Sequence, residues 1–319
     1  YLDYSREDGE WEPNIYGGRE NLDAISFFKE LNEAVYGNYE GVQTIAEEST
    51  SFPMVTKPTY LGGLGFGMKW MMGWMHDTLE YFKKEPIYRR HHQNDITFSM
   101  TYAFTENFML PLSHDEVVYG KHSILGRMPG DEWQRFANLR LLYSYMFTHP
   151  GAKLLFMGGE FGQSSEWDFQ QSLDWHLLQY GYHSGVQRLV ADLNALYKKE
   201  AALHQKQFSA EGFEWIAYDD ADNSVLAYIR HGEDPDEDLV VICNMTPVIR
   251  EDYRIGLPAP GKYRYIFNSD DTHYGGSGVI FGDRPQAEDI PWHGQEQSLA
   301  FTLPPLAMMA LKRVKQKKK

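Results

Sequence analysis

Cysteine is almost absent from this sequence, with Cys243 the single one among 319 residues. One cysteine excludes an internal disulfide and a zinc site built from cysteines, and it suits a reducing compartment such as the cytoplasm. Because Cys243 stands in the apolar run 239–243, we expect a buried, unreactive thiol. Long hydrophobic runs are missing too: no stretch approaches the roughly 18 apolar residues of a membrane span, and no signal-peptide pattern is present. We therefore expect no membrane partner.

Positive charge is also in short supply. The chain has 30 lysines and arginines against 45 aspartates and glutamates, a formal net charge of −15. A field of that sign repels phosphate backbones, so nucleic acid is not an expected partner. The short basic tail of Lys315 and residues 317–319 is interpreted as a solvated chain end.

Sequence motifs for metals and phosphates are lacking as well. The 12 histidines offer no His-Glu-x-x-His spacing, and His91-His92 stands in a charged stretch that we interpret as a solvated loop. The glycines of residues 62–67 match neither a dinucleotide loop nor a P-loop, which favours tightly packed backbone there. Gly120-Lys121 lacks the Ser or Thr that a P-loop needs, and no Gly-x-Ser-x-Gly elbow is present. No metal or cofactor is implied. Among the types of catalysis considered, the one that remains is catalysis by carboxylates.

Apolar and aromatic residues are plentiful, at 42% and 15% of the chain. The length predicts two domains at about 150 residues each, and the composition changes character near residues 207–212. We therefore expect a first domain at 1–206 and a second at 207–319. Short strand-like runs separated by turns predict an antiparallel β-sandwich for the second domain. These runs are residues 213–218, 224–230, 239–244, 253–257, 263–268, 298–303 and 306–312.

The first domain alternates helical patterns with short apolar runs. One helix should begin after the N-cap Asn21 and end at Gly37, and a second should run from Asp131 to before Pro150. A third is indicated by apolar residues spaced along 186–197. The apolar runs 42–46, 64–68, 108–112 and 153–157 are the expected strands. This alternation predicts βα units around a parallel sheet.

Three of the expected strands run into acidic residues. Glu47-Glu48 follows the first, His114-Asp115-Glu116 the third, and Glu160 the fourth. In a (β/α)₈ barrel the carboxyl ends of the strands meet on the face that carries the active site, so we expect an acidic pocket lined by aromatics. Glycoside cleavage is the leading reaction, because it needs a proton donor and a second carboxylate at one bond.

Sequence motifs at these strand ends also resemble those of a known family. Residues 44–50 (TIAEEST) and 112–117 (LSHDEV) look like two motifs of the α-amylase superfamily, in the form found in bacterial 1,4-α-glucan (glycogen) branching enzymes. Further similar segments follow in the same order along nearly the whole chain: residues 1–6, 13–21, 72–78, 172–176 and 303–306. The resemblance implies an α/β fold, namely the C-terminal part of a (β/α)₈ barrel followed by an all-β sandwich.

The resemblance also implies roles for matched residues. Glu47 corresponds to the general acid/base, Asp115 to the transition-state stabiliser and His114 to a substrate-binding histidine. Strand alternation should turn Glu48, the rival of Glu47, away from the pocket. The implied activity is cleavage of an α-1,4-glucan and transfer to a 6-hydroxyl, in the cytoplasm and by a monomer.

One departure from the family pattern concerns the nucleophile. In the family an aspartate motif precedes the segment that matches residues 1–4, and neither Asp3 nor Asp8 has its surroundings. Residues 1–206 also supply four strand candidates, where a full barrel has eight. We therefore expect a C-terminal fragment whose half barrel has an open edge, lacks a nucleophile and is inactive alone.

Two alternatives to branching remain open. The parent protein could be an α-glucan hydrolase, or this chain alone could be a non-catalytic glucan-binding or structural piece. Trp74, Trp167 and Trp175 are candidate sugar-stacking residues, although core packing is the more common role for each. Tyr274, Trp292 and His293 are weaker candidates in the sandwich, where turn or packing roles are expected.

Overall fold

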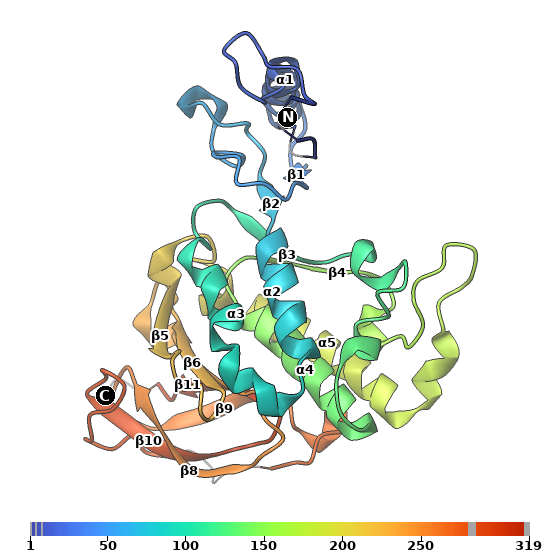
Figure 1. The fold of residues 1–319 in the computed structure, drawn as a ribbon. Coiled ribbons are helices and arrows are strands. Elements are labelled where there is room, and N and C mark those ends of the chain that lie inside the picture. Colours follow the sequence, from blue (N-terminus) through green and yellow to red (C-terminus); the bar gives the residue numbers. More distant parts are fainter. Residues whose placement is uncertain (1, 4, 8, 280–284, 316–319) are drawn as a thin grey trace.

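The computed structural model describes residues 1–319 apart from 1, 4, 8, 280–284 and 316–319 (Figure 1). Its first helix, α1 (Leu22–Asn38), begins after Asn21, whose side-chain oxygen accepts a hydrogen bond from the amide of Ala24 at 2.9 Å. The predicted start is therefore confirmed. The predicted end at Gly37 is wrong, because the helix continues to Asn38 and the amide of Tyr39 closes its last turn on Val35.

A four-stranded parallel sheet follows α1. Its strands are β1 (Ile45–Ala46), β2 (Met68–Trp70), β3 (Phe108–Leu112) and β4 (Ala152–Leu155), paired in that order. Four parallel strands are present, the number expected, and β3 has the predicted bounds. The other three differ in extent, and the expected strand at 64–68 is wrong except for its last residue. There Gly65 has φ +79°, and a Cβ on Gly63 would lie 2.1 Å from the carbonyl oxygen of Lys57. Residues 62–67 are therefore the tightly packed backbone expected from their glycines.

Helices cover one face of this sheet (Figure 1): α2 (Met72–Lys83), α3 (Gln93–Thr97), α4 (Glu132–Thr148) and α5 (Gly181–Lys199). The helices α4 and α5 were predicted, and Asp131 caps α4 as expected by accepting from the amide of Gln134 at 2.8 Å. Helix α2 was missed, because no side chain caps its start and Gly73 stands in its first turn. Its buried Trp74 packs in one core with Leu110 of β3 and Leu142 of α4.

The rest of the chain is all-β. The strands are β5 (Phe213–Ala217), β6 (Val225–Arg230), β7 (Leu239–Asn244), β8 (Arg250–Leu257), β9 (Tyr263–Asn268), β10 (Gln297–Leu303) and β11 (Ala307–Arg313). They form an antiparallel five-stranded sheet, β5-β6-β7-β11-β9, and an antiparallel pair, β10-β8. Val240 and Ile242 of the first sheet share a core with Ile255 and Leu299 of the second. All seven predicted strands are confirmed within a few residues.

Buried arginines join the two parts. Arg89 donates to the carbonyl of Met245, Arg140 to that of Ser269, and Arg230 to that of Thr148, at 2.8, 3.1 and 2.7 Å. Burial of their guanidinium groups lowers the pKa of each arginine to about 10. His91 is exposed and His92 is half-buried, so the pair is solvated as expected, although His91 ends a 3₁₀ turn and His92 lies 3.1 Å from Asp95.

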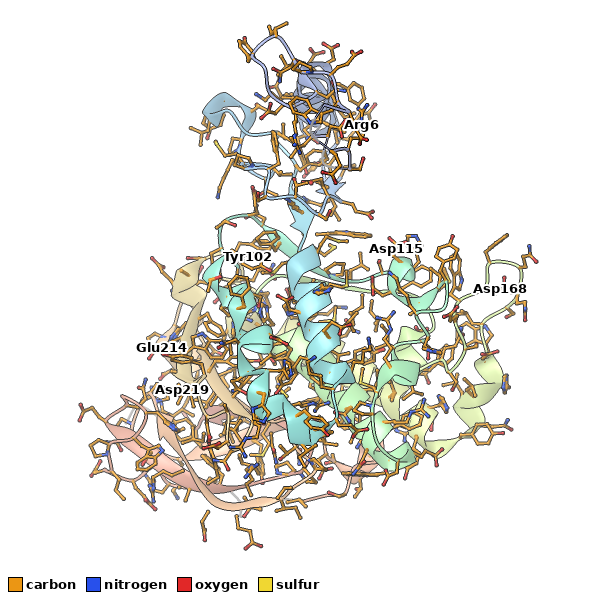
Figure 2. The ribbon with its side chains drawn as sticks, viewed as in Figure 1. Arg6, Tyr102, Asp115, Asp168, Glu214 and Asp219 are labelled. Carbon is orange, nitrogen blue, oxygen red and sulfur yellow. The ribbon has the colours of Figure 1, made fainter. Side chains whose placement is uncertain are left out.

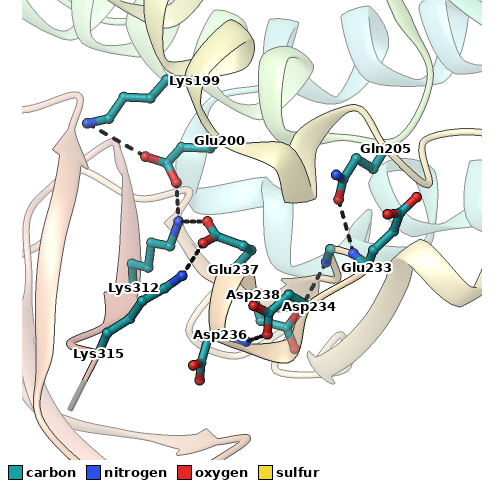
Figure 3. Close-up of polar contacts among 11 residues, drawn as sticks. Lys199, Glu200, Gln205, Glu233, Asp234, Asp236, Glu237, Asp238, Lys312 and Lys315 are labelled. Carbon is teal, nitrogen blue, oxygen red and sulfur yellow. Dashed lines mark hydrogen bonds and ion pairs between the residues drawn. The ribbon is translucent and has the colours of Figure 1, made fainter. Parts of the chain in front are cut away.

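An ion-pair network crosses the same junction (Figure 3). Glu200, after α5, lies 2.6 Å from the ammonium of Lys312 in β11, and Lys312 also pairs with Glu237. Lys315 is exposed, as expected for a solvated chain end, and its ammonium lies 2.6 Å from the Glu237 carboxylate. Lys317–Lys319 lie outside the described residues. In the described part of the chain, none of the helices is both long and apolar enough to cross a membrane.

Candidate active site

The parallel sheet brings the acidic strand ends to one edge. Glu47 directly follows β1, His114 and Asp115 begin the 3₁₀ turn η4 (His114–Val117) after β3, and Glu160 lies in η6 (Gly159–Phe161) after β4. Figure 2 labels Asp115 to the right of α2, below the segment that contains α1 and β1. Because β2 alone separates β1 from β3, these two strands lie about 10 Å apart.

Glu47 and Glu48 occupy opposite faces of the sheet. Ala46, which alternates with Glu47, is buried in a core cluster, whereas Ile45 and Glu47 are exposed. The Glu48 carboxylate lies 3.4 Å from the Lys69 ammonium, and both side chains are more than nine-tenths buried. Glu47 is therefore the carboxylate of this pair that a ligand can reach. Strand alternation predicted that Glu48 would point away from Glu47, and it does.

His114 and Asp115 lie together beside an aromatic pair. The His114 Nε2 is 3.3 Å from Asp115 Oδ1, and the imidazole packs against Phe156 and Trp167 with ring centroids 5.9 and 6.2 Å away. Phe156 and Trp167 meet edge-to-face at 5.0 Å. Of the three tryptophan candidates, Trp167 is thus the one that contacts a predicted site residue.

Buried Glu116 anchors the turn that carries these residues. Its carboxylate lies 3.2 Å from the Lys121 ammonium and 3.1 Å from the Arg127 guanidinium. Arg127 also donates to the backbone carbonyl of Glu116. Glu116 therefore points into the protein and holds η4 in place, while Asp115 remains half-exposed on the outer side.

A second carboxylate, Glu166, ties the loop after β3 to the loop after β4. It accepts hydrogen bonds from the amides of Gly120 and His122, at 3.1 and 2.7 Å, and these bonds lower the pKa of Glu166. Tyr119, Gly120 and His122 all have positive φ values, of 58°, 79° and 66°. The Gly120-Lys121 segment is thus a tight turn closed by a carboxylate, and sequence reasoning missed Glu166 because its partners are 44 and 46 residues away.

The remaining candidates divide between core and surface. Trp74 is fully buried in the core, and Trp175 is half-exposed against Phe161. In the all-β part, Tyr274 is buried and its hydroxyl donates to Asp192 at 2.6 Å. Trp292 is 47% exposed and adjoins His293. The packing roles expected for Trp74 and Tyr274 are therefore observed.

The acidic candidates lie at the surface of the described part of the chain, and the acidic, aromatic-lined pocket stays a prediction. Glu47 is exposed, and the side chains of His114 and Asp115 are 47% and 43% exposed, so they stand on an open surface. A cavity of about 20 Å³, lined among others by Leu112, Phe156 and Trp167, leaves room for roughly one water. Asp3 pairs with Arg6, and Asp8 lies outside the described residues. No group of three His, Cys, Asp or Glu side chains in the described ranges is placed to hold a metal ion.

Comparison with solved structures defines the class of fold. The α-amylase of H. orenii superimposes with a TM-score of 0.54 at 15% identity, over 92% of this chain and 58% of that one. A pullulanase of Anoxybacillus sp. LM18-11, solved with maltotetraose, gives a TM-score of 0.60 at 15% identity, over 91% and 42%. Residues 215–314 match the model of the α-amylase C-terminal all-β domain. The chain has an α-amylase fold, an α/β barrel part followed by that all-β domain, as predicted.

Curated relatives narrow the class further. The chain is 60% identical over 312 residues to the 1,4-alpha-glucan branching enzyme GlgB of Aquifex aeolicus, and 59% identical over 312 residues to that of Rubrobacter xylanophilus. Each match takes in 98% of this chain but 49% and 43% of the relative, so the chain spans about half the length of these enzymes or less. The resemblance to bacterial branching enzymes is confirmed along nearly the whole chain.

Proposed function

We propose that this chain contributes Glu47, His114 and Asp115 to the active site of a retaining transglycosylase. The enzyme would cleave an α-1,4-glucan, such as amylose or glycogen, and transfer the cut chain to a 6-hydroxyl. The observation that carries the proposal is the difference between two adjacent glutamates after β1. Glu47 is exposed at the carboxyl end of the strand, whereas Glu48 is buried against Lys69.

In the proposed reaction, Glu47 first donates a proton and later takes one back. In the first half, Glu47 protonates the glycosidic oxygen as its bond to the anomeric carbon breaks and a carboxylate nucleophile attacks that carbon. In the second half, the Glu47 carboxylate takes the proton of the acceptor 6-hydroxyl, whose oxygen displaces the carboxylate. We assign the nucleophile to no residue of this chain.

Asp115 and His114 are proposed to hold the sugar. An ionised Asp115 accepts hydrogen bonds from ring hydroxyls and opposes the positive charge of the oxocarbenium-like transition state. His114, supported by Phe156 and Trp167, offers a second polar group beside an aromatic surface. A cytoplasmic location, a monomeric state and the domain limits 1–206 and 207–319 remain predictions.

The test uses a chimera with a relative. Residues 1–319 replace the matching half of the A. aeolicus enzyme, and iodine colour and reducing ends are measured together on amylose. We expect colour to fall with almost no new reducing ends. Glu47→Gln should lower kcat about 10²–10⁴-fold, the usual contribution of a general acid. The exposed Glu40→Gln, in the turn before β1, is the matched control and should keep full activity.

Two results would overturn the proposal. A folded chimera that retains activity after Glu47→Gln contradicts the role of Glu47. A folded chimera that releases reducing ends in step with the loss of colour is a hydrolase, so the transfer activity would be wrong even if Glu47 proves essential.

A further inference from the structure

A cavity of about 500 Å³ lies where the end of α5 meets the all-β part. Its lining comes from residues 199–200 at the end of α5, from the 3₁₀ turn η10 (Pro235–Glu237), from β9 and from residues 312–315 at the end of β11. Figure 3 shows the chain of ion pairs that runs through it. None of these lining residues belongs to the candidate active site, and the volume falls within the range of small-molecule sites.

Positively charged side chains predominate in this cavity. The described lining residues include five cations, Lys199, Arg264, Lys312, Arg313 and Lys315, against two carboxylates, Glu200 and Glu237. The chain as a whole has a formal net charge of −15. A local excess of cations on such an acidic chain favours an anion as the ligand of this cavity.

Two carboxylates hold the central lysine in place. The Lys312 ammonium lies 2.6 Å from Glu200 and also pairs with Glu237, and the side chains of Lys312 and Glu200 are both more than nine-tenths buried. These carboxylates occupy two of the three N–H donors of the ammonium, so one donor remains for a ligand. Because Lys312 is already fixed, binding costs little side-chain entropy.

Like charges stand opposite each other beside this lysine. In the five-stranded sheet β11 lies between β7 and β9, and Lys312 is the register partner of Leu239 on β7 and of Arg264 on β9. Like charges directly opposite on neighbouring strands are destabilising. Arg264 is exposed, and the structure shows no ion pair for it among the residues it describes. An anion between Arg264 and Lys312 would relieve this repulsion.

The acidic residues nearby lie on the other side of Lys312. The segment 233–238, which carries five carboxylates, directly precedes β7, whereas Arg264 is on β9. One of the five, Asp236, pairs with Arg313. An anion that binds next to Arg264 would therefore approach Lys312 from the side opposite to this segment.

Shape and charge together limit the class of ligand. A long polyanion such as a nucleic acid would extend beyond the cavity over a chain of net negative charge. A neutral ligand would leave the like charges of Lys312 and Arg264 uncompensated. A phosphate group has several acceptor oxygens, which match the planar donor fork of a guanidinium and the N–H donors of an ammonium.

We propose that this cavity binds a small molecule that carries one or two phosphate groups, with phosphate oxygens held by Arg264, Lys312 and Lys199. The lining comes from both the α/β part and the all-β part, so the ligand would stabilise the junction between them. This inference does not depend on the proposed function.

The test is calorimetric titration of the 319-residue chain with inorganic phosphate, inorganic diphosphate and glycerol 3-phosphate, at a constant ionic strength of about 0.15 M. Glycerol is the neutral control and should not bind. We expect diphosphate to bind more tightly than phosphate, because it can reach two cations at once. Tighter binding of glycerol 3-phosphate than of phosphate would indicate a phosphate ester as the natural ligand, and the reverse order would indicate free phosphate.

Substitutions locate the binding site. Arg264→Gln should weaken diphosphate binding about fivefold, and Arg264→Lys, which keeps the charge, about twofold. Lys199→Gln should weaken it about twofold. Lys198→Gln is the matched control, because Lys198 is also exposed at the end of α5 but does not line the cavity, and it should leave the affinity unchanged.

Three results would overturn the inference. The first is a folded chain that binds none of the three phosphates. The second is wild-type affinity in both Arg264→Gln and Lys199→Gln, which would place the bound anion elsewhere. The third is an equal loss of affinity in Lys198→Gln and Lys199→Gln, which would reduce the effect to the total charge of the chain.

Discussion

Two adjacent glutamates at the end of β1 have opposite environments. Glu48 is buried in an ion pair with Lys69, and Glu47 is exposed. The cause is strand alternation, which places neighbouring residues on opposite faces, together with the packing of the helices on one face alone. A buried pair of this kind is costly to break, because removing Lys69 would leave a carboxylate without a partner in the interior.

His231 is a residue for which a pH effect on stability near neutral pH is expected. Its Nδ1 lies 2.8 Å from Asp238 and its Nε2 lies 3.3 Å from Glu214, and the hydrogen bond to Asp238 is the main cause of the raised pKa of His231. The stabilisation should be complete below the ordinary histidine pKa of about 6.5 and should disappear as pH rises through the higher folded value.

We therefore expect the urea midpoint to fall slightly between pH 6.5 and 8, by less than ~1 kcal/mol in free energy, because the group is half-exposed. His231→Gln should remove this part of the pH dependence, whereas the exposed His91→Gln should not. An unchanged pH profile in His231→Gln would contradict the assignment.

At the scale of elements, the same type of cap begins two very different helices. Asn21 caps α1, which has one buried residue, Asn32, whereas Asp131 caps α4, whose last thirteen residues are all buried. The cap at the start of α4 is a capping box, because the Gln134 side chain in turn accepts a hydrogen bond from the amide of Asp131 at 3.2 Å. A cap on a helix embedded in the core supports the whole fold, and a cap on an exposed helix supports that helix alone.

Asp131→Ala should therefore lower the free energy of global unfolding by about 0.5–2 kcal/mol, the usual effect of losing an N-cap. Asn21→Ala, the matched variant, should increase amide exchange within α1 and leave the global urea midpoint almost unchanged. Equal shifts of the global midpoint in both variants would show that α1 is as strongly coupled to the core as α4.

At the scale of the molecule, we expect the α/β part and the all-β part to unfold as one unit. One hydrophobic core contains Leu142 of α4 together with Tyr228 and Val241 of the five-stranded sheet. Arg230 of that sheet reaches three backbone carbonyls outside its own strand, those of Thr148, Leu203 and Gly212. A planar guanidinium with several donors can satisfy carbonyls from three segments at once.

Arg230→Met should lower the free energy of unfolding by about 3 kcal/mol or more, because three buried carbonyls lose a charged donor. Arg188→Met is the control. Half-exposed Arg188 of α5 also reaches the all-β part, through one hydrogen bond of 2.8 Å to the carbonyl of His273, and its loss should cost less than ~1 kcal/mol. Similar losses in both variants would contradict a special role of Arg230 at the junction.

The amino-acid sequence by itself determined what depends on neighbours along the chain. The caps Asn21 and Asp131, the bounds of β3 and the seven strands of the all-β part follow from periodicity, capping and turn residues. The motifs around Glu47 and Asp115 indicated the family, and alternation separated Glu47 from Glu48. These are local signals, because backbone dihedrals and side-chain directions repeat over a few residues.

Only the tertiary structure decided what depends on partners far away in the chain. Uncapped α2 is a helix because its Trp74 side packs into the core, and Arg89 is buried because Met245, 156 residues away, offers it a carbonyl. Glu166 closes the turn at Gly120 from another loop, and Glu47 and Asp115 lie at the surface of the described part of the chain. Burial and hydrogen-bond partners are properties of the folded chain, and residue spacing alone does not contain them.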